Sequence, residues 1–424
     1  MRRIVVIVAL AAGALIGQTR LTLEDAEQIA LKGNPQIGVA TFNALVAEQA
    51  TREVRSNYFP NIVGSLTGVG GNDATRIGAG SLTAGSIYNR IGTGVSASQL
   101  LWDFGRTGSL VEASRLRELS LGQNTQFTRA LVRLQVDRAY FAALRGQSVL
   151  RVAEQTVAAR QLVVDQVTAL AESNLKSTLD VSFARVNLSE VKLLLAQAQN
   201  DVQAAFADLA SAMGLREADP QWMLVDTAMG SGPEPDPAAL LVAALKNRPD
   251  VASARLDVES AKRLIAAERA LSMPTVSAVA AGGALPVHSD LMTGTYSGAA
   301  LNVNVPVFNG HAFSARRGQA EYRASAVEQN LRDLQNRVAR DVKVAWLGTA
   351  TAWQRVGLTA EFLDQAALAL ELAQARYDLG LSSIVELSQA QLSKTNAEIQ
   401  QASARYDFQL QSAVLKFQTG ALVP

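Results

Sequence analysis

The feature that most constrains the fold is that the sequence contains two similar halves. A shift of 214 residues aligns Pro60 with Pro274 without a gap, and a shift of 206 residues later in the chain aligns Gly214 with Gly420. Self-similarity over this length indicates that one supersecondary unit is present twice. We therefore expect each half to form the same elements in the same order.

The start of the chain and a proline-rich stretch set further boundaries. Arg2 and Arg3, the apolar run Ile4–Leu10 and the small residues after it have the pattern of a secretory signal peptide. Later windows lack the 18 or so uncharged apolar residues of a transmembrane helix. The predicted division is a signal peptide over 1–17, a first structural repeat over 18–214, a linker or equatorial region over 215–237, and a second structural repeat over 238–424.

Each half carries helical periodicity interrupted by two short stretches of β character. We predict helices over 22–57, 106–172 and 178–213, and their counterparts over 237–272, 311–379 and 384–419. The predicted strands are 61–70 and 92–101 in the first half, and 275–284 and 298–307 in the second. At 1.5 Å per residue each of the longest helices would reach about 100 Å, and two shorter helices end to end could pair along it.

The predicted strands have a length and an alternation that suit a bilayer. In the strand 298–307, Leu301 and Val303 alternate with Asn302 and Asn304, so that one face is apolar and the other polar. Strands of 9 to 11 residues cross a membrane at about 45° tilt, but they must close into a barrel. Because the smallest single-chain barrels have about eight strands, four strands require other subunits, and a trimer would supply twelve. A soluble platform of two hairpins stays open as an alternative.

Composition excludes most enzyme classes. The chain has no Cys and two His, and its formal charge of +1 shows no footprint for nucleic acid. Asp103-Phe104-Gly105 resembles a kinase metal motif, but its companion motifs and the phosphate-binding glycine loops are missing. We therefore expect no catalytic residues, no metal and no cofactor, and we interpret Trp102 and Phe308, at the strand-to-helix junctions, as interfacial aromatics.

Several motifs resemble one family. These are Leu21–Ala26, the Lys-x-x-Pro positions, Leu101–Gly105 with its counterpart Val307–Gly310, and the segment Tyr377–Ser383. Together they resemble the TolC-type outer-membrane efflux family over nearly the whole mature chain. The resemblance implies a homotrimer in the outer membrane that extends into the periplasm, with a 12-strand β-barrel and a helical barrel of about 100 Å.

The same resemblance implies what the protein does. A periplasmic adaptor and an inner-membrane pump would dock at the helical end, and the tube would carry drugs, ions or exported proteins outward without chemistry of its own. The alternative from a different class is a periplasmic coiled-coil scaffold without a pore.

The two turns between long helices carry the candidate sites. Asn174 and Gly380 suit a left-handed residue that ends a helix, and Ser383-x-x-Glu386, like Ser177-x-x-Asp180, suits a capping box. In a trimer Glu386 would also form a ring of three carboxylates that favours cations. The leucines of the turns have no reason to face water, so we predict an adaptor-docking tip formed by Asn174, Leu175, Leu379, Gly380 and Leu381.

The resemblance further assigns roles to single positions. Glu386 falls on an aspartate of an entrance ring, and Gln389 stands at the second ring position. Asp165, Tyr377 and Gly380 fall on a hydrogen-bonded latch that closes the entrance, but Ser382 stands where the family has an arginine. The resemblance thus predicts a pore entrance with one acidic ring and a latch without its cationic partner.

Overall fold

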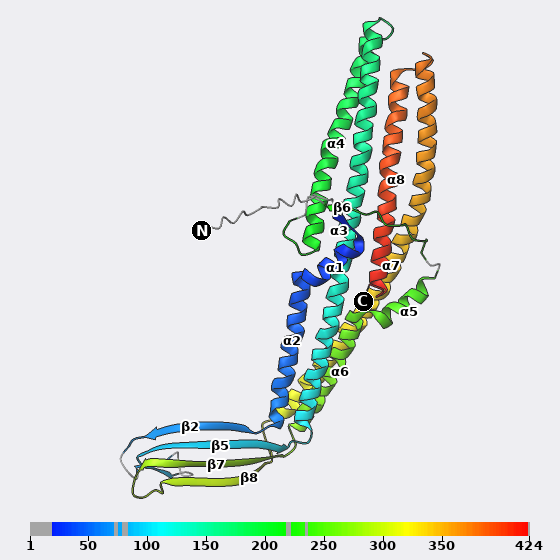
Figure 1. The fold of residues 1–424 in the computed structure, drawn as a ribbon. Helices are drawn as coiled ribbons and strands as arrows, with labels where there is room; N and C mark the ends of the chain where they lie inside the picture. Colours follow the sequence, from blue (N-terminus) through cyan, green and yellow to red (C-terminus); the bar gives the residue numbers. More distant parts are fainter. Residues whose placement is uncertain (1–18, 72–74, 79–83, 218–221, 234–235, 423–424) are drawn as a thin grey trace, which may run out of the picture. The chain divides into compact units, whose positions relative to one another are not determined.

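The computed structural model describes residues 19–71, 75–78, 84–217, 222–233 and 236–422 (Figure 1). The predicted signal peptide, residues 1–17, lies outside this part of the chain. The chain forms two compact units. The first comprises Met1–Gly38, Phe127–Arg248 and Val338–Pro424, and the second comprises Val39–Gln126 and Pro249–Arg337. Each unit therefore draws segments from both halves of the sequence.

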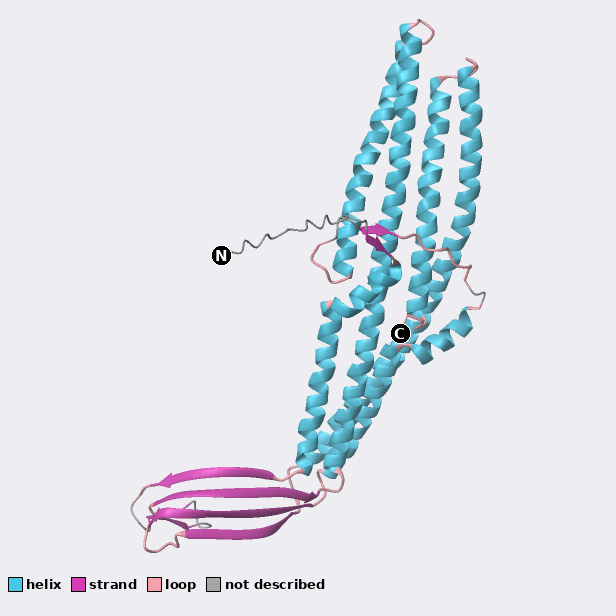
Figure 2. Ribbon diagram, in the orientation of Figure 1, coloured by secondary structure: helices cyan, strands magenta, loops and turns pink. Residues whose placement is uncertain are grey.

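The described chain is mainly helical, with few strands (Figure 2). Two helices of 67 residues, α3 and α7, are each followed by a helix of 35 residues. The bounds are α1 Leu23–Gly33, α2 Pro35–Arg55, α3 Arg106–Glu172, α4 Thr178–Ala212, α5 Pro237–Asn247, α6 Pro249–Ala270, α7 Ala312–Asp378 and α8 Ile384–Gln418, with a short 3-10 turn, η1, over Ser56–Tyr58. Across the described residues, no helix combines the length and the hydropathy that a membrane crossing requires.

The helices predicted over 22–57 and 237–272 are wrong as single helices, because each is broken at a proline. Asn34 and Arg248 leave the helical conformation, both with φ −70° and ψ 124°, directly before Pro35 and Pro249. A proline ring clashes with a helical residue before it and offers no N–H to the preceding turn. The apolar periodicity continues through both breaks, which is why periodicity alone merged the two helices.

The second unit contains an antiparallel sheet of four strands in the order β2-β5-β7-β8. These strands span Asn61–Val69, Arg90–Trp102, Thr275–His288 and Thr295–Asn304. β7 therefore runs beyond the predicted end at 284, with a register shift near Pro286, and β8 ends at Asn304 rather than at 307. Pro306 explains the earlier end of β8, because it cannot donate to a strand ladder. Within the described residues, nothing pairs with the outer edges of β2 and β8.

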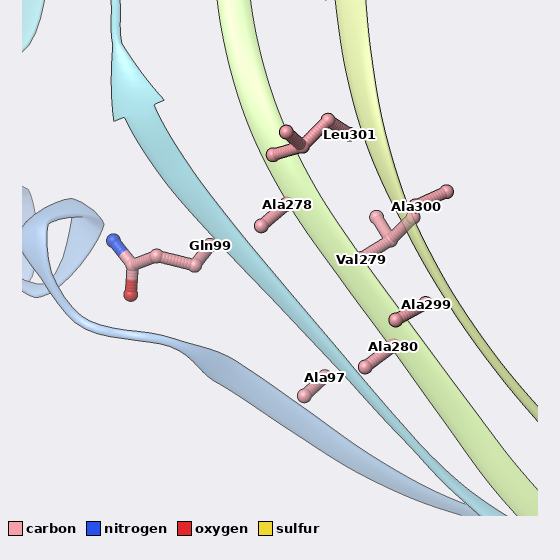
Figure 3. A pocket seen from close by; sticks show the side chains of 8 residues that line it. All are labelled: Ala97, Gln99, Ala278, Val279, Ala280, Ala299, Ala300 and Leu301. Carbon is pink, nitrogen blue, oxygen red and sulfur yellow. The ribbon is translucent and has the colours of Figure 1, made fainter.

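The register places the apolar side chains of different strands on one face of this sheet. Val95 lies opposite Gly64 and Gly282, and Leu301 lies opposite Ala278, so that all of them share a face. Ser96 and Asn302 lie on the other face. The apolar face is exposed in the single chain. A pocket at this sheet, shown in Figure 3, is lined from this face by Ala97, Gln99, Ala278, Ala280, Ala299 and Leu301, and by Val279 and Ala300, which the register assigns to the other face.

Two short strand pairs were not predicted. β3 (Thr75–Gly78) and β4 (Ala84–Ile87) pair antiparallel in the stretch of sequence between β2 and β5, where no strand was predicted. β1 (Thr19–Leu21) and β6 (Trp222–Leu224) pair in parallel in the first unit, and β6 lies within the predicted linker. Strands of three or four residues are too short for an alternation pattern to be distinguished from chance.

Polar contacts hold the helices of the second unit side by side. α2 contacts α3 through Thr51 and Ser114, whose hydroxyl oxygens are 3.2 Å apart. α6 contacts α3 through a buried hydroxyl pair, Ser120 and Ser253, at 2.9 Å, and Ser260 donates to the carbonyl of Ala113 at 2.8 Å. Small residues at these positions let the helix backbones approach closely, as expected for shorter helices packed along a long one.

The core of the first unit gathers around Tyr140, which is fully buried on α3. Its hydroxyl lies 2.8 Å from the carbonyl oxygen of Leu21 and 2.7 Å from that of Val225, and it accepts a hydrogen bond from the N–H of Val225 at 3.1 Å. Burial raises the pKa of Tyr140 to about 12. One buried side chain thereby holds the ends of both β1 and β6 against the long helix.

We predict that Gly214→Ala destabilises the first unit. Gly214 has a φ of +80°, and a Cβ there would lie 2.8 Å from Cα of Asn34 at the first helix break. A left-handed alanine costs about 1–3 kcal/mol, and the steric contact adds to this cost. Gly33→Ala is the control, because its Cβ would meet nothing within 4 Å. Urea unfolding of both variants tests the prediction, and equal unfolding midpoints would contradict it.

Candidate functional site at the helical tips

The turns that join α3 to α4 and α7 to α8, both in the first unit, end their helices as expected. Asn174 has a φ of +58° and Gly380 a φ of +72°, both in the left-handed region. The N–H of Leu175 donates to the carbonyl of Leu170 at 2.9 Å, and that of Leu381 donates to the carbonyl of Arg376 at 2.8 Å. These bonds satisfy carbonyls that the helix end would otherwise leave unpaired.

The two following helices begin differently. At α4 the predicted capping box is confirmed, because Ser177 Oγ accepts from the N–H of Asp180 at 3.3 Å and the Asp180 carboxylate accepts from the N–H of Ser177 at 3.1 Å. At α8 Ser383 Oγ accepts from the N–H of Glu386 at 3.3 Å, but the carboxylate of Glu386 instead lies 3.2 Å from Nε of Arg376. The reciprocal capping box predicted for Glu386 is therefore wrong.

Arg376 gives Glu386 a cationic neighbour that the sequence analysis did not predict. It precedes the turn on α7 and reaches across to Glu386 on α8. Both side chains are about half exposed, 57% and 46%, so the pair contributes at most about 1 kcal/mol to stability. Its effect on charge is more direct, because the guanidinium of Arg376 offsets the negative charge of Glu386 within the same chain.

Tyr377 is buried, 6% exposed, in a small apolar cluster with Val167, Ile384 and Leu387. Burial raises the pKa of its hydroxyl, which has no hydrogen-bond partner in the described part of the chain. Nζ of Lys176, from the other tip, lies 4.0 Å from the centre of the ring. A cation over an aromatic face is attracted by the ring quadrupole, so Lys176 links the two tips through Tyr377.

The remaining latch and ring positions are not brought together within the chain. Asp165 is exposed and accepts a hydrogen bond from Gln161 at 2.9 Å on its own helix. Oγ of Ser382 is buried, and among the described residues it has no partner. Gln389 is exposed on α8 and lines a cavity between α4 and α8.

Apolar side chains project from both tips. Leu175, Leu379 and Leu381 are 70%, 75% and 68% exposed. Such large side chains at the ends of helical hairpins expose apolar surface that could be buried only against another molecule. The structure therefore places the residues of the predicted docking tip where a partner can reach them.

The predicted interfacial aromatics lie in the second unit at the junctions of strand and helix. Trp102 is 60% exposed and meets Phe104 edge-on at 6.0 Å between ring centres, and Phe308 is 82% exposed and meets His311 at 6.0 Å. Glycines turn the chain at both junctions, Gly105 with a φ of +82° and Gly310 with a φ of +63°. Phe104 and His311 also have positive φ, which the sequence did not predict.

Sequence reasoning missed a buried acidic pair in the first unit. Arg133 forms an ion pair with Glu27 at 2.5 Å and donates to the carbonyl of Leu422 at 3.0 Å. Asp137, one turn further along α3, is 3% exposed, and its carboxyl group neighbours the carboxylate of Glu27. Burial and the neighbouring carboxylate raise the pKa of Asp137 to about 8. Glu27 is 106 positions from Arg133, so no local pattern could have revealed the pair.

The described residues form a mainly helical chain with two distinctive surfaces. The long helical hairpins end in exposed leucines, and the four-stranded sheet exposes an apolar face and two unpaired edges. In the part of the chain that the structure describes, no group of three His, Cys, Asp or Glu side chains could hold a metal ion.

Comparison with known proteins shows the family. The profile of the family described as outer membrane efflux protein matches residues 27–215 and 240–421, and the chain belongs to that family. It therefore localises to the outer membrane and extends into the periplasm. The family resemblance of the sequence is thereby confirmed.

Individual relatives agree over most of their length. The outer membrane efflux protein BepC of Brucella suis is 22% identical over 98% of this chain and 89% of its own. The solvent efflux pump outer membrane protein SrpC of Pseudomonas putida is 25% identical over 85% and 77%. A crystal structure of CusC has the same fold, with a TM-score of 0.81 at 20% identity over 94% of this chain and 92% of its own. These relatives are efflux proteins and not enzymes.

We predict that the stability of the protein falls between about pH 4 and pH 8 because of Asp137. The folded protein holds this proton up to about pH 8, whereas an unfolded aspartate releases it near pH 4. The contribution is complete below pH 4 and is lost as the pH rises, with a slope of at most about 1.4 kcal/mol per pH unit. Asp137→Asn should flatten this dependence in thermal unfolding followed by tryptophan fluorescence, whereas exposed Asp364→Asn should not.

Proposed function

We propose that the protein is the outer-membrane channel of a tripartite efflux or secretion system. It would form a passive trimeric exit duct from the periplasm to the exterior and dock a periplasmic adaptor and an inner-membrane pump. The observation that carries the proposal is an open four-stranded sheet with an exposed apolar face, in a chain of the outer membrane efflux family. This favours a channel over the alternative of a periplasmic scaffold without a pore.

The trimer and its barrel are supported by the sheet edges. In lipid, unpaired N–H and C=O groups cost several kcal/mol each, so the outer edges of β2 and β8 need strands from other copies. Three copies would join twelve strands around a lumen that Ser96 and Asn302 line, with Val95 and Leu301 toward lipid. The exposed Trp102 and Phe308 would then lie at the membrane interface.

The transported cargo follows from the pump and not from the duct. The relatives carry names for different cargoes, solvent efflux for SrpC and a cation efflux system for CusC of Escherichia coli O157:H7. A wide tube offers few specific contacts, so that the same fold suits drugs, metal ions or exported proteins. Adaptor docking would use the exposed leucines of the tips. Burying these apolar side chains against a partner removes them from water and so favours binding.

The closed entrance would differ from one held by ion pairs between subunits. Asp165, Tyr377, Gly380 and Ser382 would form the latch, Glu386 one acidic ring, and Gln389 a neutral second ring. The hydroxyls of Tyr377 and Ser382 support this role, because both lack a hydrogen-bond partner among the described residues. Both oxygens are buried in the single chain, so a bond to a neighbouring subunit would require the tip to shift when the subunits meet. Lys176 over the Tyr377 ring would take the place of the family's arginine as the cation of the latch.

We expect Leu301→Arg to impair membrane insertion and Asn302→Arg to be tolerated. An arginine on the lipid face near the bilayer midplane costs about 2–4 kcal/mol, whereas one in an aqueous lumen does not. The yield of heat-sensitive, detergent-extracted trimer in outer-membrane fractions measures the difference. Extraction of the unmodified protein in buffer without detergent, or equal yields for both variants, would contradict the barrel.

We expect Tyr377→Phe to raise single-channel conductance in planar bilayers. The change removes only the hydroxyl, which has no partner in its own described chain, so the variant tests whether this hydroxyl bonds to another subunit in the closed entrance. Tyr322→Phe, at an exposed tyrosine, is the matched control. Unchanged conductance in Tyr377→Phe would rule out the latch.

Glu386→Gln should separately reduce cation preference and block by trivalent cations, because it removes three carboxylates from the trimer.

A further inference from the structure

A cavity of about 400 Å³ lies inside the first unit between the facing sides of α4 and α8. Asn187 on α4 donates to Oγ of Ser388 on α8 at 2.7 Å and bridges the two helices. Phe183 and Leu392 add apolar surface to the walls, and the carboxamide of Gln389 adds a polar group. A cavity of this size, with apolar and polar side chains both in its walls, suits a small-molecule site.

The third wall of the cavity contains a buried cation. Arg160 projects from α3 and is 5% exposed, although it stands beside the apolar α3–α4 cluster of Val157 and Val164. Its Nε is fully buried, and among the described residues it has no hydrogen-bond partner. No described carboxylate lies within 4 Å of the Arg160 guanidinium, the distance that would make an ion pair. Glu190, at the rim of the cavity, influences the charge of Arg160 only from a longer distance.

Helix packing does not require an arginine at this position. The residue 206 positions later, on α7, is Ala366, and it is equally buried at 6% exposure. A small side chain is therefore sufficient where the second long helix packs. Burial of an unpaired charge is unfavourable, as the lowered pKa of Arg160, caused by that burial, also indicates. The buried, unpaired guanidinium of Arg160 destabilises the fold and lines the cavity. A ligand of opposite charge in the cavity would offset this unfavourable free energy.

We propose that this cavity binds a small organic monocarboxylate with an apolar body. The guanidinium of Arg160 would take the carboxylate through two parallel hydrogen bonds, a geometry that lysine cannot offer. The apolar body would lie against Phe183 and Leu392, and Asn187 and Gln389 would supply further donors. Glu190 at the rim would repel a second negative charge, so the site selects monoanions. The whole site lies within one chain and depends neither on the trimer nor on the pump.

Binding is tested with the full-length protein in lipid nanodiscs by isothermal titration calorimetry, using 2-naphthoate as the probe. The neutral 2-naphthamide and the small anion acetate are matched ligands that lack the charge and the apolar body, respectively. We expect naphthoate to bind with a stoichiometry of one per chain and each of the other two at least tenfold more weakly. Equal affinity of naphthoate and naphthamide would overturn the proposal, and so would equal affinity of naphthoate and acetate.

Variants separate a ligand site from a structural arginine. Arg160→Ala should weaken naphthoate binding at least tenfold and leave the melting temperature of the unliganded protein unchanged or higher, as Ala366 implies. Arg185→Ala, at an exposed arginine on α4, is the control and should bind normally. Glu190→Gln keeps Arg160 and should tighten binding severalfold. Undiminished affinity in Arg160→Ala, or no change in Glu190→Gln, would overturn the proposal.

Discussion

The close backbone contact at the two helix breaks is the constraint on which the first unit depends. Gly214, after α4, leaves room for Asn34 between α1 and α2, and Gly420, after α8, leaves room for Asn247 and Arg248 between α5 and α6. Each glycine has a positive φ and backbone atoms within about 3 Å of the place of a Cβ. Only glycine satisfies both conditions, so the short helices can meet the ends of the 35-residue helices.

Side-chain hydrogen bonds complete each of these contacts. The amide of Asn34 donates to the carbonyl of Ala212 at 2.9 Å, and Arg248 donates to the main-chain carbonyl of Gln418 at 3.3 Å at the matching place in the other half. Both bonds satisfy carbonyl oxygens in the last turn of a helix, where intrahelical donors run out. Each helix break is therefore stabilised by its own hydrogen bonds, and Pro35 or Pro249 only determines the residue at which the break occurs.

The second unit depends on a different condition, the pairing of strands through small residues. Gly94 and Gly283 leave space for the ring of Tyr296, and a Cβ at either position would overlap that side chain. Between Ala278 and Ala284 the central strand β7 consists almost entirely of alanine and glycine, so this stretch offers little large apolar surface to the neighbouring strands. This sheet buries little apolar area within its own chain, and its stability as an isolated element is correspondingly low.

Local patterns in the sequence were sufficient for the long helices α3, α4, α7 and α8, the four strands of the main sheet and the turns at the tips. Periodicity, prolines and the pairs Asn174/Gly380 and Ser177/Asp180 act within a few residues, and they are readable for that reason. The family, too, could be recognised from motifs of this kind. Only the tertiary structure decided the contacts between side chains that the sequence pattern does not link. Glu27 pairs with Arg133 and lies beside Asp137, and Lys176 lies over the ring of Tyr377. Glu386 pairs with Arg376 instead of completing a capping box, and Arg160 lies in the cavity between α4 and α8. The physical reason is that the free energy of a buried or paired charge depends on which groups surround it in space, and sequence spacing does not encode those neighbours.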